Sequence, residues 1–286
     1  MTAEESPSRI TDHVSRSTPD VSSLVAGVLK SAKYRNVCDD LIRSIGAQEL
    51  ERRRGLKEAI KATKDRLHQV AGAYLDRRVD YAAWLEELAA ASQAGDRTAL
   101  RPICARIMRH HASSRERLPF LAEFYARTLA GLGPIRSVLD VACGLNPLAI
   151  PWMPLAEEAA YYAYDIYHDM VGFVGRFLPL AGMAGQAVVC DVTRHCPSQR
   201  VDLALLLKTI PCLEQVDRSA GRRLLDRIDA THLLVSFPTR SLCGASKGMP
   251  ANYEAHFHDL VAGRGWTIER FEFPTELAFV ARPKAS

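Results

Sequence analysis

The chain has 286 residues, of which 48% are hydrophobic and 24% are charged, and its formal net charge is +4. This is the composition of a globular protein long enough for one large domain, or for one domain with an appendage. No apolar run approaches the roughly 18 residues that a membrane-spanning helix needs, and the polar residues 1–20 do not have the pattern of a secretory signal. The sequence therefore predicts a cytoplasmic protein without a membrane partner.

The cysteines and histidines do not suggest a metal site. None of the seven cysteines belongs to a Cys-x-x-Cys pair, and none of the nine histidines belongs to a His-Glu-x-x-His motif. Most of the cysteines lie in apolar surroundings, so we interpret them as reduced core residues rather than as disulfides or zinc ligands. We expect no bound metal.

The first part of the chain predicts a lead-in followed by helices. Residues 1–22 are polar and rich in serine, threonine and acids, which is typical of disorder. Residues 23–110 then carry apolar residues at helical spacing, and we expect them to form an N-terminal helical domain. Residues 111–286 are expected to form a second domain.

Basic charge gathers in the predicted helical domain. Residues 30–78 contain 13 lysines and arginines against 7 acids, whereas the rest of the chain has a small negative excess. Such a block favours a polyanionic partner such as RNA, although an ordinary solvated helix surface is the alternative. The candidate RNA-binding residues are Arg52, Arg53, Arg54, Lys57, Lys61 and Lys64.

Residues 113–129 predict one more helix before the pattern changes. Ser113 and Glu116 have the spacing of a capping box, which would open a helix that runs to Leu129. Arg115 and Arg117 flank the start of this helix. An arginine there could pair with a carboxylate of a ligand, and a surface salt bridge is the alternative.

From residue 137 onward, strand-like segments alternate with helical ones, which predicts a parallel sheet with helices on both faces. Only two residues separate the last two segments, too few for a crossover helix, so these should pair antiparallel at a sheet edge. The pattern predicts an α/β, doubly wound, Rossmann-like fold with a seven-stranded, mostly parallel sheet, in the variant typical of class I methyltransferases. The expected strands are residues 137–142, 160–164, 186–190, 201–207, 231–237, 266–273 and 276–282.

Three strand ends carry residues suited to a nucleoside ligand. A single glycine, Gly144, follows the first strand, where it would let the backbone approach a ligand. Asp165 ends the second strand, where an acid can accept hydrogen bonds from ribose hydroxyls. Asp191 ends the third, where an acid can accept one from an adenine amino group. Because the chain has neither a Gly-x-Gly-x-x-Gly motif nor a phosphate-loop lysine, the set favours S-adenosylmethionine over NAD or ATP. Solvated turns and helix caps are the alternative.

Lys208 ends the fourth strand and should face the transfer site, where a lysine can hold a phosphate or a base of the target. A cation that merely reaches solvent is the alternative. The Asn/Asp-Pro-Pro-Tyr signature of amino-group methylation is absent, and no cysteine pair suggests attack on a pyrimidine carbon. The predicted nucleophile is therefore already reactive, such as a ring nitrogen with a free lone pair, and catalysis would consist chiefly of orienting that lone pair.

Four stretches of the chain carry a family resemblance. They are His111-Ala-Ser-Ser-Arg-Glu-Arg-Leu-Pro119, Asp140-Val-Ala-Cys-Gly-Leu-Asn-Pro-Leu148, Leu205-Leu-Leu-Lys-Thr-Ile-Pro-Cys-Leu-Glu214 and Ser236-Phe-Pro-Thr-Arg-Ser-Leu242. They resemble the aminoglycoside-resistance 16S rRNA methyltransferases, and more narrowly the Sgm-type enzymes of antibiotic-producing actinomycetes, which modify N7 of guanine-1405. The resemblance covers residues 25–284.

The resemblance implies a cofactor site at the positions that match the family's motifs. They are Tyr74, His111, Ala112, Ser113, Ser114, Arg115, Glu116, Arg117, Ala142, Gly144, Asp165, Asp191, Val192 and Leu207. It further implies that Arg115 meets the methionine carboxylate and that Lys208 lies beside the target guanine, which makes these two the candidate catalytic residues. The N-terminal helical part would dock on the small ribosomal subunit.

The implied function is methyl transfer from S-adenosylmethionine to N7 of guanine-1405 in the 16S rRNA of the 30S subunit, carried out by a monomer. It would give resistance to aminoglycosides of the kanamycin and gentamicin type, because the methyl group adds positive charge and blocks an acceptor. Two alternatives stay open. One is a methyltransferase for a small metabolite, and the other is a non-catalytic RNA-binding protein with a relic cofactor pocket.

Overall fold

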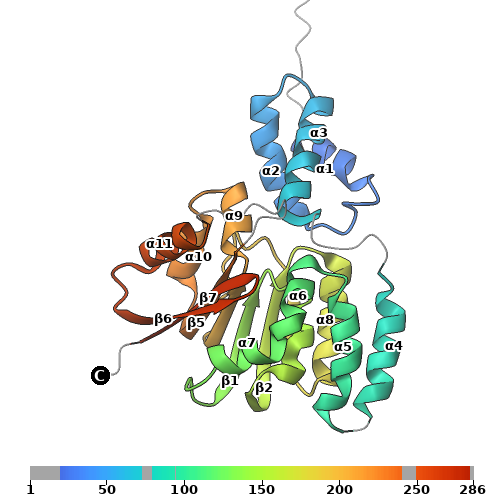
Figure 1. The fold of residues 1–286 in the computed structure, drawn as a ribbon. Helices are drawn as coiled ribbons and strands as arrows, with labels where there is room; N and C mark the ends of the chain where they lie inside the picture. The colour runs from blue at the N-terminus through green and yellow to red at the C-terminus, as the bar shows by residue number, and fades with distance from the viewer. Residues whose placement is uncertain (1–19, 73–78, 94, 240–248, 284–286) are drawn as a thin grey trace, which may run out of the picture.

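The centre of the molecule is a seven-stranded sheet (Figure 1). This computed structural model describes residues 20–72, 79–93, 95–239 and 249–283. The strand order is β3-β2-β1-β4-β5-β7-β6; β7 is antiparallel to both of its neighbours, and the other pairings are parallel. The predicted fold is confirmed, although β7 lies inside the sheet and β6 forms the edge. The strands are β1 (Ile135–Val141), β2 (Leu155–Asp165), β3 (Ala184–Val189), β4 (Val201–Leu207), β5 (Ala230–Pro238), β6 (Trp266–Phe273) and β7 (Glu276–Pro283).

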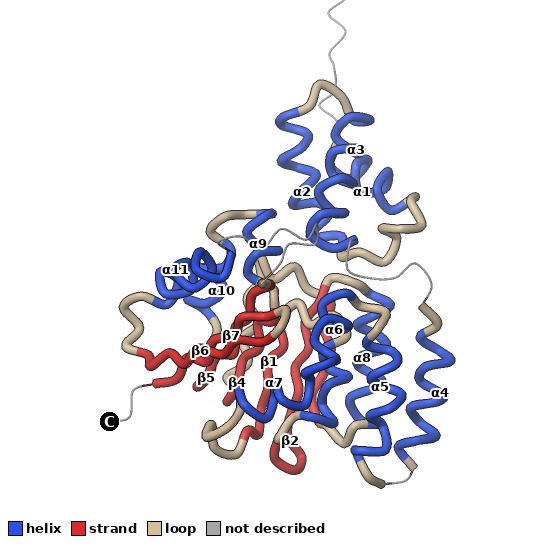
Figure 2. Tube along the Cα trace, viewed as in Figure 1, coloured by secondary structure: helices blue, strands red, loops and turns tan. Residues whose placement is uncertain are grey.

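Helices cover both faces of the sheet (Figure 2). Along β4, Leu203, Leu205 and Leu207 join the core beneath α4, α5, α7 and α8, whereas Ala204 and Leu206 join the core beneath α9, α10 and α11. Successive side chains of a strand point to opposite faces, so an unbroken apolar run is what a strand covered on both sides requires. The helices are α4 (Tyr81–Ser92), α5 (Arg101–Met108), α6 (Ala112–Arg117), α7 (Leu121–Thr128), α8 (His168–Leu180), α9 (Ile210–Val216), α10 (Ala220–Arg227) and α11 (Met249–Val261).

Residues 20–72 form a separate helical module, here called the N-terminal module, at the top of Figure 1. Its own core includes Leu24, Ile42 and Ile45, which are fully buried. The apolar residues of its helices recur three and four positions apart, which places them on one face of each helix. The module consists of α1 (Val21–Leu29), α2 (Asp39–Arg52), α3 (Leu56–Leu67) and a π-helical turn (His68–Gly72).

The N-terminal module is attached to the sheet next to the end of β2. The backbone N–H of Cys38 donates to the carbonyl of Ile166 at 2.7 Å, and the N–H of His168 donates to the carbonyl of Asn36 at 2.8 Å. These bonds join the module to the segment that directly follows Asp165. A change in the module's position would therefore act on the backbone at the carboxyl end of β2.

The packing divides the chain differently from the predicted boundaries. Helices α4 and α5 contribute Trp84, Leu88 and Cys104 to the main core under the sheet, so the structural boundary falls before residue 79 rather than at 110. Amphipathic helices can pack on either neighbour, and their periodicity does not say which one. The predicted lead-in is also too long, because Asp20 caps α1 and the helix begins at Val21. Residues 1–19 lie outside the described residues.

The predicted capping box does not form. The N-cap of helix α6 is His111, two residues before the predicted Ser113, and the helix ends at Arg117. A 3-10 turn that contains Pro119 separates it from α7. Proline has no N–H, and its ring clashes with the carbonyl four residues back, so a continuous helix is interrupted there. The interruption lets α6 and α7 take separate directions.

The pairing of β2 with β3 depends on Gly185. This residue has φ of +110°, and a Cβ built there would lie 2.2 Å from the carbonyl oxygen of Tyr161. We predict that Gly185→Ala lowers the free energy of unfolding by about 3 kcal/mol or more, through left-handed strain and overpacking together. Gly133→Ala is the matched control, because it has φ of +76° but no atom within 4 Å. Urea denaturation measures both, and equal losses would contradict the role of Gly185.

Candidate active site

The carboxyl ends of β1 to β4 surround a cavity of about 980 Å³, including its opening to solvent. Ala142, Asp165, Asp191 and Leu207 lie in its wall, one from the end of each of these strands. The crevice at the carboxyl ends of the strands is where doubly wound folds bind their ligands.

Three residues after the strand ends have left-handed backbone. Ala142, Gly144 and Lys208 have φ of +52°, +53° and +60°. A non-glycine residue in this region is strained, and such strain concentrates at functional sites. A Cβ on Gly144 would lie 2.6 Å from Nε2 of His111. The glycine is therefore required for packing against His111, not only for the approach of a ligand as the sequence suggested.

Asp165 connects the end of β2 to the glycine turn. Its Oδ2 accepts a hydrogen bond from the N–H of Gly144 at 2.8 Å, and its Oδ1 accepts one from the N–H of Ile166 at 2.7 Å. Burial raises the pKa of this carboxyl above its ordinary value, and the backbone N–H groups oppose that rise. The carboxylate is thereby held in one orientation in the cavity wall, with acceptor capacity left for hydroxyl donors.

Asp191 presents an acceptor that the described protein does not satisfy. Its Oδ1 accepts from the N–H of Thr193 at 3.0 Å and from the Thr193 hydroxyl at 2.6 Å. Its Oδ2 is buried and has no hydrogen-bond partner among the described residues. An unsatisfied buried acceptor is costly, so this oxygen fits a donor such as the amino group of adenine. Val192 lies beside it in the cavity wall.

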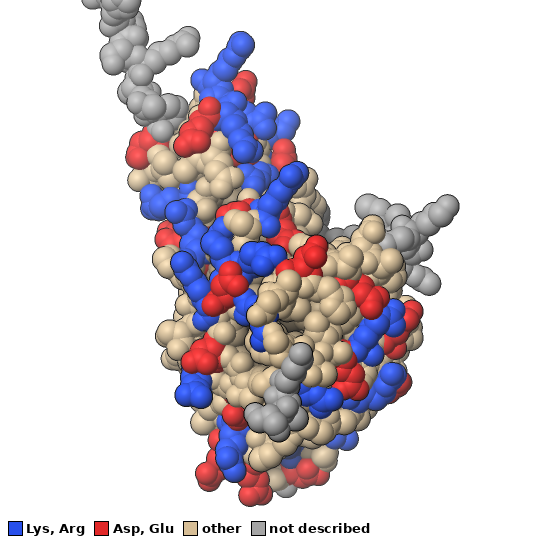
Figure 3. Space-filling view, turned by 90° about the vertical axis from the view of Figure 1, so that its left-hand side faces the viewer, with Lys and Arg blue, Asp and Glu red and all other residues tan. Residues whose placement is uncertain are grey.

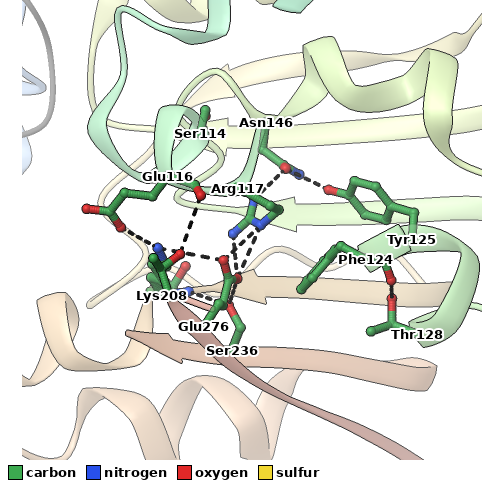
Figure 4. Close-up of polar contacts among 12 residues, drawn as sticks. Ser114, Glu116, Arg117, Phe124, Tyr125, Thr128, Asn146, Lys208, Ser236 and Glu276 are labelled. Carbon is green, nitrogen blue, oxygen red and sulfur yellow. Dashed lines mark hydrogen bonds and ion pairs between the residues drawn. The ribbon is translucent and has the colours of Figure 1, made fainter. Parts of the chain in front are cut away.

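A cluster of charged side chains lies beside the cavity, and two of its members, Arg117 and Lys208, also line the cavity wall. Figure 4 shows their contacts. Glu276, fully buried at the start of β7, receives three hydrogen bonds from Arg117: Nη2 donates to Oε1 at 2.7 Å, and Nε donates to Oε2 at 3.0 Å and to Oε1 at 3.2 Å. Lys208 Nζ lies 3.6 Å from Glu276 Oε2 and 2.6 Å from Glu116 Oε2. Burial favours a higher pKa for Glu276, but Arg117 and Lys208 outweigh it and hold the pKa below its ordinary value.

Asn146 connects this cluster to β1. Its Oδ1 accepts from Arg117 Nη1 at 3.0 Å and from the Tyr125 hydroxyl at 2.7 Å, and its Nδ2 donates to Asp140 Oδ2 at 2.9 Å. The Tyr161 hydroxyl donates to the same Asp140 oxygen at 2.6 Å. Burial raises the pKa of Asp140 to about 6. Asn146 therefore satisfies both a buried cation and a buried acid.

The predicted residues of α6 separate into two groups. His111, Ser113, Ser114 and Arg117 line the cavity, Ala112 is buried, and Glu116 reaches Lys208. Arg115 is exposed, and its guanidinium donates to the carbonyl of Arg109 at 3.0 Å. Burial and the nearby positive charges lower the pKa of His111 to about 4, so its imidazole is neutral at pH 7. Tyr74 lies outside the described residues.

The predicted RNA-binding residues lie on the N-terminal module, where lysine and arginine side chains gather (Figure 3). All but one are exposed; Lys64 is half-buried. Arg52 and Arg53 lie 3.9 and 3.2 Å from Glu49, so part of their charge is compensated. The described residues contain no helix able to span a membrane and no cluster of metal-ligating side chains.

Sequence reasoning missed Glu276, Asn146 and Thr193. An acid at the start of the apolar segment 276–282 was the only sign of Glu276. Its partner Arg117 lies 159 positions away, so only the folded sheet brings them together. Asn146 could have been suspected as a polar residue enclosed by Leu145 and Pro147 in an apolar turn.

We predict that Glu276→Gln lowers the free energy of unfolding at pH 7 by about 3–5 kcal/mol, because Arg117 then remains buried without a counter-charge and Lys208 keeps only Glu116. The difference from wild type should shrink as the pH falls from 4.5, the ordinary pKa of a glutamate, through the lower pKa of native Glu276, because the carboxyl is protonated first in the unfolded chain and then in the native protein. Arg127→Gln is the control: it breaks an exposed pair with Glu123 and should cost less than about 1 kcal/mol. Urea titrations at several pH values test this, and a pH-independent difference would contradict it.

Comparison with known proteins identifies the family. Residues 30–280 match the family model described as ribosomal RNA methyltransferase (FmrO). The chain is 38% identical over 262 residues to the 16S rRNA (guanine(1405)-N(7))-methyltransferase of Micromonospora echinospora, covering 91% of this chain and 96% of that protein. It is 40% identical over 258 residues to the enzyme of the same name from Frankia casuarinae, covering 89% and 91%.

Solved structures agree with this comparison. The 16S rRNA methyltransferase RmtF in complex with S-adenosyl-L-homocysteine superimposes with a TM-score of 0.76 at 30% identity, covering 92% of this chain and 98% of that one. The 16S rRNA methylase RmtB gives a TM-score of 0.74 at 29% identity, covering 93% and 99%. Sequence, fold and cavity thus point the same way, and the chain belongs to the FmrO family of ribosomal RNA methyltransferases.

Proposed function

We propose that this protein transfers a methyl group from S-adenosylmethionine to N7 of guanine-1405 in 16S rRNA, with the assembled 30S subunit as substrate. The observation that carries the proposal is the match to curated enzymes of that specificity over about nine-tenths of the chain, which includes both the cavity and the N-terminal module. Acting as a monomer in the cytoplasm, it would make its host resistant to aminoglycosides of the kanamycin and gentamicin type.

The cavity residues fit the cofactor. Asp165 is placed to accept from the ribose hydroxyls, and the unsatisfied Oδ2 of Asp191 is suited to the adenine amino group. When bound, S-adenosylmethionine supplies an electrophilic methyl group on a sulfonium. Arg117 lines the cavity but is already bonded to Glu276 and Asn146, whereas Arg115 is exposed, donates to the Arg109 carbonyl and is not one of the cavity-lining residues. The role of Arg115 therefore stays a prediction.

The target side of the site requires orientation more than proton transfer. Guanine N7 has a free lone pair, so no general base is needed, and the base must leave its stack to enter the pocket. Lys208 is buried, with its ammonium fixed between Glu116 and Glu276 and its backbone in the left-handed region. An ammonium can donate to O6 of guanine while the N7 lone pair stays free to attack the methyl group, and we assign Lys208 this positioning contact on the target.

We assign docking on the 30S subunit to the N-terminal module, residues 20–72, rather than to the longer span 23–110. The exposed Arg52, Arg53 and Arg54 lie on the module, whereas α4 and α5 belong to the sheet's core. Leu41 and Val70 of the module also line the cavity. A module that touches both the ribosome and the cofactor site would bring the target base to the methyl donor.

Two substitutions should separate the cofactor side from the target side. We expect Asp165→Ala to abolish binding of S-adenosylhomocysteine in calorimetry. We expect Lys208→Ala to keep that affinity within about threefold but to lower methyl transfer to 30S subunits at least a hundredfold, the scale on which lost orientation acts. Full transfer by Lys208→Ala, or unchanged affinity of Asp165→Ala, would refute the respective assignment.

The same assays distinguish the alternatives. Unlabelled 30S subunits together with a methylated metabolite would favour a small-molecule methyltransferase. Absence of cofactor binding by the wild-type protein would favour a non-catalytic RNA-binding protein.

Charge reversal of Arg52, Arg53 and Arg54 to glutamate should weaken 30S binding and reduce its dependence on salt, because fewer phosphate counterions are released. Cofactor affinity should be unchanged. The matched control reverses three exposed arginines of the sheet domain, Arg136, Arg176 and Arg200. The affinity of both triple variants for 30S subunits would be measured across a salt series. Equal losses would contradict the assignment of 30S docking to the N-terminal module.

A further inference from the structure

We propose that Thr193 is a positioning residue of the cofactor site, whose hydroxyl makes Asp191 selective for a purine with a 6-amino group. The inference rests on the proposed function, since it concerns how the same cavity recognises S-adenosylmethionine. The two oxygens of the Asp191 carboxylate differ in their hydrogen bonds. Both hydrogen bonds that Asp191 receives from Thr193 go to Oδ1, and Oδ2 receives none from the described residues.

The hydroxyl bond is the shorter of the two. Thr193 Oγ1 lies 2.6 Å from Asp191 Oδ1, whereas the Thr193 backbone nitrogen lies 3.0 Å away. Two donors on one oxygen fix the rotation of the carboxylate about its side-chain bond. With that rotation fixed, Oδ2 is the carboxylate oxygen that the described residues leave without a donor. Because ionised carboxylates only accept hydrogen bonds, the complementary ligand group is an N–H or O–H donor.

The hydroxyl is not needed to shape the loop. The N–H groups of Arg194 and His195 donate to the Asp191 carbonyl at 3.1 and 3.0 Å, and Arg223 Nη2 donates to the Thr193 carbonyl at 3.1 Å. These backbone contacts do not involve the Thr193 side chain. Removal of the hydroxyl should therefore release the carboxylate while the loop keeps its course. The side chain is nearly buried, with 9% of its surface exposed, and it lies in the cavity wall.

The contribution of Thr193 is selectivity rather than general affinity. A purine amino group gains the full binding free energy of a hydrogen bond to Oδ2 only if that oxygen is already oriented. A purine without the amino group cannot form this bond, so the orientation does not change its affinity. A purely structural role would weaken both ligands to the same extent. A positioning role and a structural role of Thr193 therefore predict different ratios between the affinities for the purine with the 6-amino group and the purine without it.

The test uses calorimetry with S-adenosylhomocysteine and with its analogue that carries hydrogen in place of the 6-amino group. Wild type should prefer the amino compound by roughly tenfold to a hundredfold, the range of one hydrogen bond to a charged group. Thr193→Val, which keeps shape and the backbone donor, should reduce that preference about tenfold and leave the affinity for the analogue unchanged. Thr193→Ser, which restores the hydroxyl, should restore the preference.

Three results would overturn the inference: no preference in wild type, an unchanged preference in Thr193→Val, or equal losses for both ligands. If Thr193→Val does not fold, the comparison of Thr193→Ser with Thr193→Ala replaces it, and equal preferences in these two would overturn the inference as well. If the wild-type protein binds neither ligand, the proposed cofactor itself fails, which is a different outcome from a failure of Thr193.

Discussion

The ion cluster around Glu276 is the constraint on which the rest of the site depends. A single fully buried carboxylate, supplied by the strand inserted antiparallel between β5 and β6, faces Arg117 from α6 and Lys208 from β4. Without it Arg117 would be a buried cation with no counter-charge, which costs several kcal/mol, and Lys208 would keep only Glu116. The antiparallel β7 thus has a functional consequence: it brings the acid to the edge where the cofactor and the target are expected to meet.

The cluster also links elements that are otherwise independent. Arg117 bonds to Asn146, Asn146 bonds to Asp140 in β1, and Asp165 in β2 holds the glycine turn between them. The N-terminal module adds its own connection, since it bonds to the segment after Asp165 and supplies part of the cavity wall. The module that we propose to dock on the ribosome therefore also forms part of the cavity wall.

Much of this could be predicted from the sequence, because the relevant signals are local. Strand-end acids such as Asp165 and Asp191, and a lysine after an apolar run, follow from strand periodicity and from where doubly wound folds bind ligands. The hairpin of β6 and β7 followed from a two-residue connection. The place of β7 inside the sheet did not, because strand order is decided by packing that spans the chain.

The remaining features depend on contacts between distant residues. Glu276 meets Arg117 across 159 positions, and a side chain on Gly144 would clash with His111. The packing of α4 and α5 on the sheet, instead of on the preceding helices, depends on which apolar face is available in three dimensions. An amphipathic pattern predicts that one face of a helix is buried, but it does not predict which element packs against that face.

The central claim is that this site places guanine N7 of one nucleotide against the methyl donor. The most direct measurement is to incubate the protein with 30S subunits and S-adenosylmethionine and to map the modified nucleotide by chemical cleavage and reverse transcription. The account predicts one new 7-methylguanine, at guanine-1405, which is lost with Lys208→Ala. Unmodified 30S subunits, or a methyl group at another nucleotide or another atom, would contradict it.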